Sequence, residues 1–334
     1  MEVSRKMALH PIIFLLLGIG SFILIYAILA LSLNLQQGYT GLPNFGLIGF
    51  YGIGAYATAS IIVQGINPII GIILGMLIAT VFGIAITLPA IRIREIYFAI
   101  ITIAAAEIIR IIFRNEKAIG GEYPQLGIFN IPLLFGLDYE MHKIISFLLL
   151  LLVVVCIYLI LQFIIYSMPF GRVLKAIRED EDAVKALGKD PVRYKLIAFT
   201  IGAIIASFAG SMWVLTQRGI TPDGIMPLWT FMIWIMVLLG GMGNNKGVIM
   251  GAILITGIQQ IMQELKFYIP TEVLDSNQII SLTWTIIGIL IVLVIIFLPR
   301  GVLKERKVKG SDIEKTIRNV NRGIKGWIRL LLRN

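Results

Sequence analysis

Long apolar runs alternate with short polar interruptions along most of the chain. A helix needs about 20 apolar residues to cross the hydrocarbon core of a bilayer. By that measure the sequence predicts nine spans, at residues 11–34, 46–64, 67–90, 95–113, 144–166, 194–216, 227–243, 247–264 and 279–298. We therefore expect an all-α polytopic membrane protein with about nine or ten transmembrane helices.

One stretch at membrane depth has an unusual composition. Residues 32–54 contain six glycines, one proline and the polar residues Asn34, Gln36, Gln37 and Asn44. Irregular backbone at this depth is tolerated only against protein or a water-filled cavity, so we expect a glycine-broken or re-entrant segment. An extra short pass here would give ten crossings and bring the N-terminus, with its two basic residues, inside the cell. We favour that arrangement.

The densest polar region is residues 169–195, between two apolar runs. Its 27 residues hold 12 of the 48 charged side chains, and seven of these are Lys or Arg. Basic loops between spans face the cytoplasm. We therefore expect this loop, and with it the C-terminus after the last span, to be cytoplasmic.

The same loop has helical periodicity. The apolar residues Val173, Ile177, Val184 and Leu187 recur at helical spacing and predict one amphipathic helix over residues 171–187. Gly188 suits the left-handed residue that closes a helix, and Asp190-Pro191 suits the start of the next one. A solvated connector and a docking helix for a soluble partner both fit this pattern.

Composition agrees with a membrane protein, because 58% of the residues are hydrophobic and 14% are charged. The net charge of +10 is concentrated in one tail, where residues 300–334 hold 11 Lys or Arg against three Asp or Glu. Within the tail at 302–334, apolar and basic residues alternate at helical spacing over 311–334, which predicts an amphipathic helix on the inner leaflet. A basic tail beside a membrane favours anionic lipid over nucleic acid as its partner.

The sequence offers little catalytic chemistry. It has one cysteine and two histidines, none at metal-ligand spacing, and no G-x-x-x-x-G-K-[ST] phosphate loop. The ionisable residues well inside a span are Glu107 and Arg110, whose i,i+3 spacing predicts an ion pair on one helix face. Coupling-ion transporters usually bury several carboxylates or histidines. We therefore expect a non-catalytic transport protein that binds no metal or cofactor and takes its energy from another chain.

A short glycine-rich break separates two later spans. Residues 240–247 read Gly-Gly-Met-Gly-Asn-Asn-Lys-Gly. Glycines at such a turn allow positive φ and close helix packing. We predict a tight helix hairpin here, with a gate as the alternative.

Four stretches together resemble a known family. They are Leu33-Asn34-Leu35 through Gly41 with Phe50 to Tyr56; Gly171-Arg172 through Gly188 with Tyr194 to Phe199; Leu239 to Gly243 with Gly247 and Gly251; and Leu298-Pro299-Arg300-Gly301. Occurring in this order from about residue 30 to 301, they resemble the permease subunits of branched-chain amino acid ABC importers, and among these the LivM-like member of the LivH/LivM pair.

The resemblance implies a domain organisation and a set of partners. Residues 1–301 are expected to form the permease domain in the cell membrane, followed by the basic tail. The implied partners are a homologous LivH-like permease, two ABC ATPase subunits that use ATP, an extracytoplasmic substrate-binding protein and membrane lipids.

The resemblance also assigns a role to the cytoplasmic loop. ABC importers carry a Glu-Ala-Ala motif three residues before a glycine, whose helix sits in a groove of the ATPase. Aligned on Gly188, this chain has Asp182-Ala183-Val184, which departs from the motif at the first and third positions. The implied coupling residues are Asp182, Ala183, Val184 and Gly188, with Arg178 and Glu181 beside them.

A path for the cargo is expected in the glycine-rich stretch, because broken helices expose backbone groups to polar substrates. The candidate residues are Gly38, Tyr39, Gly41, Phe45, Phe50 and Tyr51. Close helix packing is the structural alternative for these glycines. Two other functions stay open: the same machinery with urea, amides or other amino acids as cargo, and an ion-coupled secondary transporter.

Overall fold

The computed structural model describes residues 11–90, 95–120, 124–129, 131–133, 138–268, 276–297, 301–303 and 305. The chain divides into two units, residues 1–304 and 305–334, and every described helix belongs to the first. Most of the predicted tail, and the residues 298–300 of the resemblance, lie outside the described residues. The amphipathic tail helix therefore stays a prediction.

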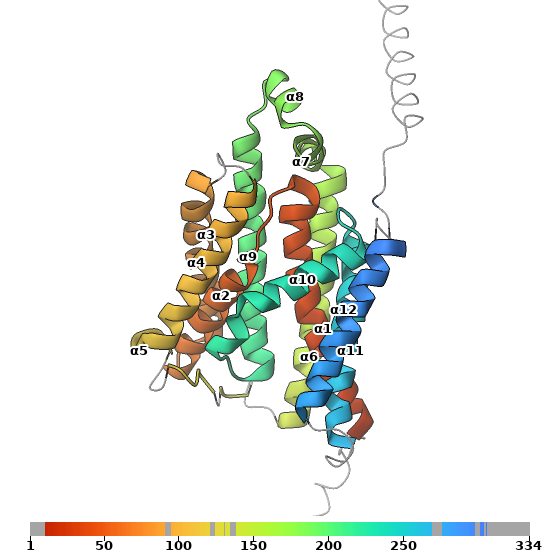
Figure 1. Ribbon diagram of the computed structural model, residues 1–334. Helices are drawn as coiled ribbons and strands as arrows, with labels where there is room; N and C mark the ends of the chain where they lie inside the picture. The colour runs from red at the N-terminus through yellow and green to blue at the C-terminus, as the bar shows by residue number, and fades with distance from the viewer. Residues whose placement is uncertain are drawn as a thin grey trace, which may run out of the picture. The chain divides into compact units, whose positions relative to one another are not determined.

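Long helices make up the first unit, with short helical turns between them (Figure 1). The long helices are α1 (Pro11–Leu33), α2 (Leu47–Val63), α3 (Pro68–Ala90), α4 (Glu95–Asn115), α6 (Tyr139–Gln162), α9 (Pro191–Gln217), α10 (Pro227–Gly240), α11 (Asn245–Tyr268) and α12 (Ser276–Phe297). The shorter elements are η2 (Asn34–Gly38), α5 (Lys117–Gly120), η4 (Phe163–Ser167), α7 (Pro169–Glu179), α8 (Glu181–Ala186) and η5 (Pro222–Ile225).

The nine long helices of the described chain coincide with the nine predicted spans, which confirms an all-α polytopic membrane protein. Within the described residues, five segments are long and apolar enough to cross a membrane: Ile12–Gly38, Pro68–Pro89, Glu95–Asn115, Tyr139–Ser167 and Pro191–Gln217. Helices α2 and α10 are apolar but shorter.

The centre of the bundle is built on small residues where α2 packs against α9. A Cβ atom on Gly54 would collide with the carbonyl oxygen of Ser207, and one on Gly210 with that of Tyr51. The hydroxyl of Thr58 donates to that of Ser211 across the same contact at 2.8 Å. Because side chains are absent at these positions, the two backbones approach closely and exchange polar contacts in an apolar surrounding.

The glycine-broken segment follows α1. Its first part, η2, is a π-helical turn, and residues 41–46 are non-helical until α2 begins at Leu47. The described residues form no extra helix here, so the tenth crossing that we favoured is wrong. The reason is that the polar side chains of this stretch bond to neighbouring helices, which satisfies an irregular backbone without another pass.

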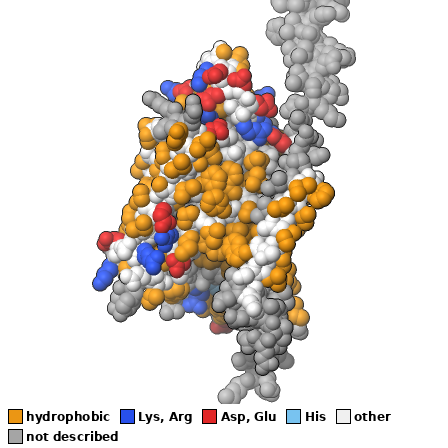
Figure 2. Space-filling model, viewed as in Figure 1, with side chains coloured by type: hydrophobic (Ala, Val, Ile, Leu, Met, Phe, Trp, Pro, Cys, Tyr) orange, Lys and Arg blue, Asp and Glu red, His pale blue; other side chains and the backbone are white. Residues whose placement is uncertain are grey.

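Apolar side chains cover the middle of the molecular surface (Figure 2). Large apolar side chains of the long helices are strongly exposed, such as Ile96, Leu152 and Val81. Charged side chains gather at the end that carries α7 and α8, with a smaller group towards the opposite end. An exposed apolar belt between two polar ends is the surface that a bilayer requires.

The predicted tight hairpin is present between α10 and α11. A Cβ on Gly240 would collide with the Gly247 carbonyl, and Gly241 and Gly243 adopt positive φ values of 109° and 77°. Residues after α12 pack on this turn, because the Val302 N–H donates to the Leu239 carbonyl at 2.8 Å.

Candidate functional site

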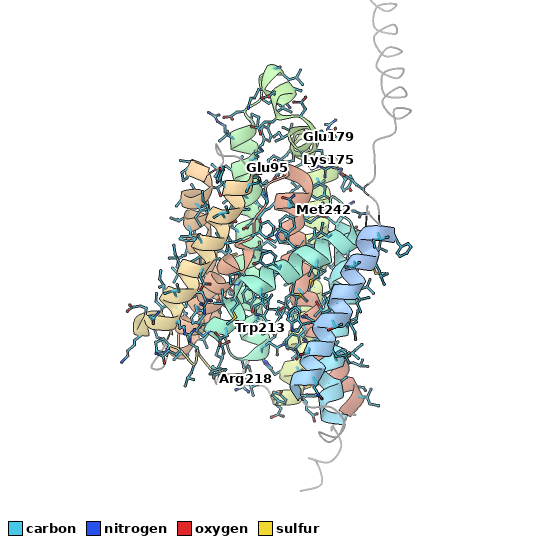
Figure 3. All side chains as sticks on the ribbon, viewed as in Figure 1. Glu95, Lys175, Glu179, Trp213, Arg218 and Met242 are labelled. Carbon is cyan, nitrogen blue, oxygen red and sulfur yellow. The ribbon has the colours of Figure 1, made fainter. Side chains whose placement is uncertain are left out.

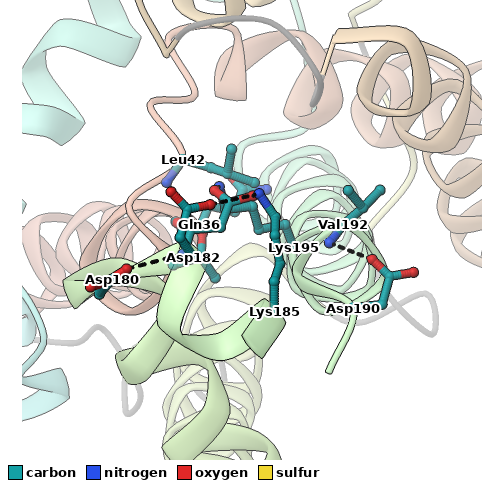
Figure 4. A network of polar contacts seen from close by, with 10 residues as sticks. Gln36, Leu42, Asp180, Asp182, Lys185, Asp190, Val192 and Lys195 are labelled. Carbon is teal, nitrogen blue, oxygen red and sulfur yellow. Dashed lines mark hydrogen bonds and ion pairs between the residues drawn. The ribbon is translucent and has the colours of Figure 1, made fainter. Parts of the chain in front are cut away.

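The charged loop at residues 169–195 folds into two helices, α7 and α8, rather than the single predicted helix. Asp180 lies between them with φ −156° and ψ 105°, and its carboxylate accepts hydrogen bonds from the backbone N–H groups of Asp182 and Ala183 (Figure 4). A side chain that caps a new helix also ends the previous one. The periodicity missed this break because the apolar positions continue in phase across it.

Both predicted helix ends are confirmed. Gly188 has φ 74° and follows α8, and its N–H donates to the Lys185 carbonyl at 2.9 Å. Asp190 caps α9 by accepting from the Val192 N–H at 3.0 Å, with Pro191 in the first turn (Figure 4).

Three of the four predicted apolar residues attach the two helices to the bundle. Val173, Ile177 and Val184 are buried together and pack against Tyr194. The fourth, Leu187, is wrongly placed by the periodicity, because its side chain is 79% exposed.

An ion-pair network fixes α8 onto α9. The Lys195 ammonium lies 2.5 Å from one carboxylate oxygen of Glu181, and the Lys185 ammonium lies 3.3 Å from the other. Burial raises the pKa of the Glu181 carboxyl, but hydrogen bonds and charge from Lys195 and Lys185 outweigh burial and hold that pKa below its ordinary value.

The outer face of α8 consists of small and charged side chains. Asp182, Ala183, Leu187 and Gly188 are all exposed, whereas Val184 points into the bundle. A Cβ on Gly188 would meet nothing within 4 Å, so glycine is needed there for its backbone conformation and not for space. Three of the implied coupling residues, Asp182, Ala183 and Gly188, are thus exposed beside Leu187, and Val184 supports this surface from inside.

Arg178 points the other way, into the protein. Its guanidinium donates to the backbone carbonyl of Gly38 in the broken segment, and its Cγ lies 3.5 Å from the Cβ position of Gly41. On the same helix, the Lys175 ammonium lies 5.5 Å from the centre of the Tyr39 ring. Helix α7 is therefore in direct contact with the break that follows α1.

The broken segment is fixed to the hairpin between α10 and α11 by a buried amide. Asn34 donates to the Asn245 side-chain oxygen at 2.8 Å and accepts from the Gly243 N–H at 2.9 Å. The Tyr39 hydroxyl donates to the same oxygen of Asn245 at 3.2 Å. Sequence reasoning missed Asn245, although an asparagine directly after the glycine-rich turn was a usable signal.

A second set of bonds fixes the remainder of the segment. Gln36 donates to the Phe199 carbonyl at 3.0 Å, and Asn44 donates to the Gln36 side-chain oxygen at 2.8 Å. The Asn44 carbonyl accepts from the indole N–H of Trp234 at 3.0 Å. Helices α9 and α10 therefore both hold the break, and no sequence pattern pointed to Trp234.

The six candidate path residues lie in different surroundings. Gly38, Tyr39 and Gly41 lie beside α7, and Phe45 stacks on Trp234 of α10 with ring centres 4.4 Å apart. Phe50 is buried against two other phenylalanines, Phe82 and Phe199. Tyr51 is the member of this set that lines an internal cavity of the described chain. The structure does not bring the six together around one opening.

Glu107 and Arg110 form an ion pair on α4. The guanidinium donates to both carboxylate oxygens, at 2.9 Å and 2.5 Å, and also lies 4.0 Å from a carboxylate oxygen of Asp223 on η5. The pair thus also joins α4 to the turn before α10.

Known proteins resemble this chain over most of its length. Residues 15–298 match the family described as "Branched-chain amino acid transport system / permease component". The "Probable branched-chain amino acid transport permease protein LivM" of Methanocaldococcus jannaschii is 30% identical, over 89% of this chain and 95% of the relative. The "High-affinity branched-chain amino acid transport system permease protein LivM" of Escherichia coli is 33% identical, over 85% of this chain and 69% of the relative.

A more distant similarity extends to a second type of subunit. The "High-affinity branched-chain amino acid transport system permease protein LivH" of Salmonella typhimurium is 26% identical, over 85% of this chain and 92% of the relative. No solved structure matches the chain.

Proposed function

The chain belongs to the family of branched-chain amino acid transport permeases, and from this premise we propose that it is the LivM-like membrane subunit of an ABC importer for leucine, isoleucine or valine. The subunit is non-catalytic, binds no cofactor itself and spans the cell membrane with its C-terminus in the cytoplasm. Its partners are a LivH-like permease, two ATPase subunits that use ATP, and an extracytoplasmic substrate-binding protein.

One observation carries the proposed coupling to ATPases. The projecting helix α8 exposes Ala183 and Leu187, while α7 bonds through Arg178 to the broken segment inside the bundle. A rigid element that binds a partner on one face and a transmembrane segment on the other transmits rigid-body motion between them. The charge around α8 and its small side chains suit insertion into a groove of a soluble protein.

The ATPase contact is tested by placing a bulky side chain on the exposed face of α8. We expect Ala183→Trp to leave the protein inserted, because Ala183 is exposed, but to lose the ATPase subunits and to lower leucine uptake about tenfold or more. Reconstituted uptake of labelled leucine with all partner subunits measures this effect. Ala85→Trp, at an exposed position on α3, is the matched control. Normal ligand-stimulated ATP hydrolysis and uptake in Ala183→Trp would contradict the docking role.

A further inference from the structure

A cavity lies at the end of the bundle opposite α7 and α8. It measures about 290 Å³, is partly open, and is lined by α1, α2, α9, α11, Phe129 and the segment from Gly219 to Trp229. Its polar and aromatic lining includes Tyr26, Tyr51, Trp213, Gln217, Gln259 and Gln260. Figure 3 shows Trp213 far from Lys175 and Glu179, which belong to α7 and mark the end of the bundle that carries α7 and α8.

Several polar groups in this cavity make no hydrogen bond to the described residues. Gln259 and Gln260 are only 7% and 8% exposed, yet neither side chain makes a hydrogen bond within the described part of the chain. The same holds there for the hydroxyls of Tyr26 and Tyr51. Because these amides and hydroxyls line the cavity, they are available to bond to water or to a solute in it.

The aromatic walls differ, because their polar atoms are already bonded to the backbone. The indole N–H of Trp213 donates to the Gly219 carbonyl at 3.1 Å, and that of Trp229 to the Asp223 carbonyl at 3.2 Å. Both rings are therefore fixed as walls. The glutamine amides and the tyrosine hydroxyls are therefore the lining groups that can form hydrogen bonds with a solute in the cavity.

The lining has no charged side chain among the described residues. A solute with a net charge would lose its hydration there without an opposite charge to replace it, which is costly. Amides and phenols can donate to a carboxylate and accept from an ammonium group at once. Phe22, Ile25, Leu29 and Ile48 supply an apolar wall for an aliphatic side chain.

We propose that this cavity is a transit binding site for amino acids with no net charge and an aliphatic side chain, held by Gln259 and Gln260 at their charged ends. The assignment rests on the proposed transport function and names where in the chain the cargo pauses. Neutral hydrogen-bonding groups hold such a solute weakly, and weak binding allows release towards the next site.

A second hollow adjoins the cavity and shares Phe22 and Gln260 with it. Its lining includes Lys143 and Glu264, one cation and one anion. The charged side chains thus stand beside the transit site and not in it. A zwitterion that approached from this side would meet both signs of charge before it reached the neutral amides.

The proposal is tested by protection of an introduced cysteine in the complete transporter. The native Cys156 is exposed and is replaced by serine, and Gln263→Cys, at a lining residue outside the two amides that hold the cargo, is then labelled with an uncharged water-soluble thiol reagent. We expect leucine at ten times its Kd to slow labelling about tenfold, because an occupied site excludes the reagent. Lysine and glutamate should give no protection. Gln64→Cys, in a separate apolar hollow, should label at one rate with or without leucine.

A second variant tests the amide itself. We expect Gln260→Leu to lower leucine uptake about tenfold, since one buried hydrogen-bonding group is lost. If leucine leaves the labelling of Gln263→Cys unchanged in a transporter whose wild type imports leucine, the cavity is not the transit site and the transport function stands. If the wild type imports no leucine, isoleucine or valine, the proposed function itself is wrong and the transit site falls with it.

Discussion

At the scale of single residues, the break after α1 depends on side-chain amides that replace backbone hydrogen bonds. Asn34 is fully buried and serves as both donor and acceptor for the hairpin between α10 and α11. Inside a membrane there is no water to take over these bonds. Each amide in this segment is therefore a structural requirement before it has any role in transport.

We expect Asn34→Leu to lower the free energy of unfolding by about 1 to 3 kcal/mol, because the Gly243 N–H and the Asn245 amide lose their buried partner. Thermal unfolding of the purified protein in detergent measures the loss. Asn115→Leu is the control, since Asn115 is exposed and donates to a carbonyl of its own helix. Equal effects of the two substitutions would contradict the role of Asn34.

The ion pairs of Glu181 give α8 a pH dependence. Because the pKa of Glu181 is lowered in the folded protein, its contribution to stability is complete above the ordinary glutamate pKa of 4.5 and is lost as pH falls through the lower folded value. The side chain is 35% exposed, so solvent screening limits the effect to about 1 kcal/mol or less.

Amide hydrogen exchange of α8, corrected for the intrinsic pH dependence of exchange, measures this change. We expect protection of residues 181–188 to fall by up to about fivefold between about pH 6 and pH 3. In Glu181→Gln the protection should already be lower at pH 6 and should change less with pH. A wild-type protein whose protection is constant over this range would show that the Glu181 pairs do not hold α8.

At the scale of elements, the contact of α2 with α9 sets the packing of the bundle. The two helices approach so closely that backbone carbonyls of one lie where a Cβ atom of the other would stand. Such a contact has no flexible side chain to move aside, so added volume must separate the helices.

We expect Gly210→Ala to destabilise the protein by about 1 to 3 kcal/mol, since its methyl group would meet the Tyr51 carbonyl. Gly257→Ala is the matched control, because a Cβ there meets nothing within 4 Å and alanine favours a helix by up to about 1 kcal/mol. The thermal unfolding temperature should therefore fall in Gly210→Ala and rise in Gly257→Ala. A shift in the same direction would show that helix propensity and not packing dominates at Gly210.

At the scale of the whole molecule, we expect all nine long helices to cross the membrane, which puts the two ends of the bundle on opposite sides. Leu187 lies at the end with α8, whereas Leu126 lies near the backbone pairing of Ile128 with Ile220 at the other end. In a background without Cys156, we expect Leu187→Cys to react with a membrane-impermeant reagent only from the cytoplasm. Leu126→Cys should react only from outside, and labelling of intact cells and inverted vesicles distinguishes the two. Labelling of both from one side would contradict the nine-span arrangement.

Helix positions were predictable from the sequence because apolar length alone determines a span. The ends at Gly188 and Asp190 were also predictable, since they depend on local backbone chemistry. The break at Asp180 was missed because a cap can interrupt a helix without disturbing its apolar phase. Positions of the candidate path residues were not predictable, because they depend on which helices come together and not on local sequence.

The cavity shows a similar limit. Gln259, Gln260 and Gln263 stand together in an apolar span, and this was a visible signal of a polar interior. Tyr26 and Tyr51, which line the same cavity, come from two other helices far away in the chain. Periodicity assigns a residue to a face of its own helix. Predicting a cavity also requires knowing which faces of the other helices pack against that face.

The contact of Arg178 with Gly38 has a consequence for the evolution of this protein. The guanidinium binds a backbone carbonyl, and a Cβ on Gly38 would collide with the Asn34 side chain. No exchange of side chains between positions 38 and 178 can compensate for a change at either one. Comparison of many related sequences should therefore reveal no paired substitutions at positions 38 and 178. A map of correlated mutations would not show the contact between α7 and the broken segment.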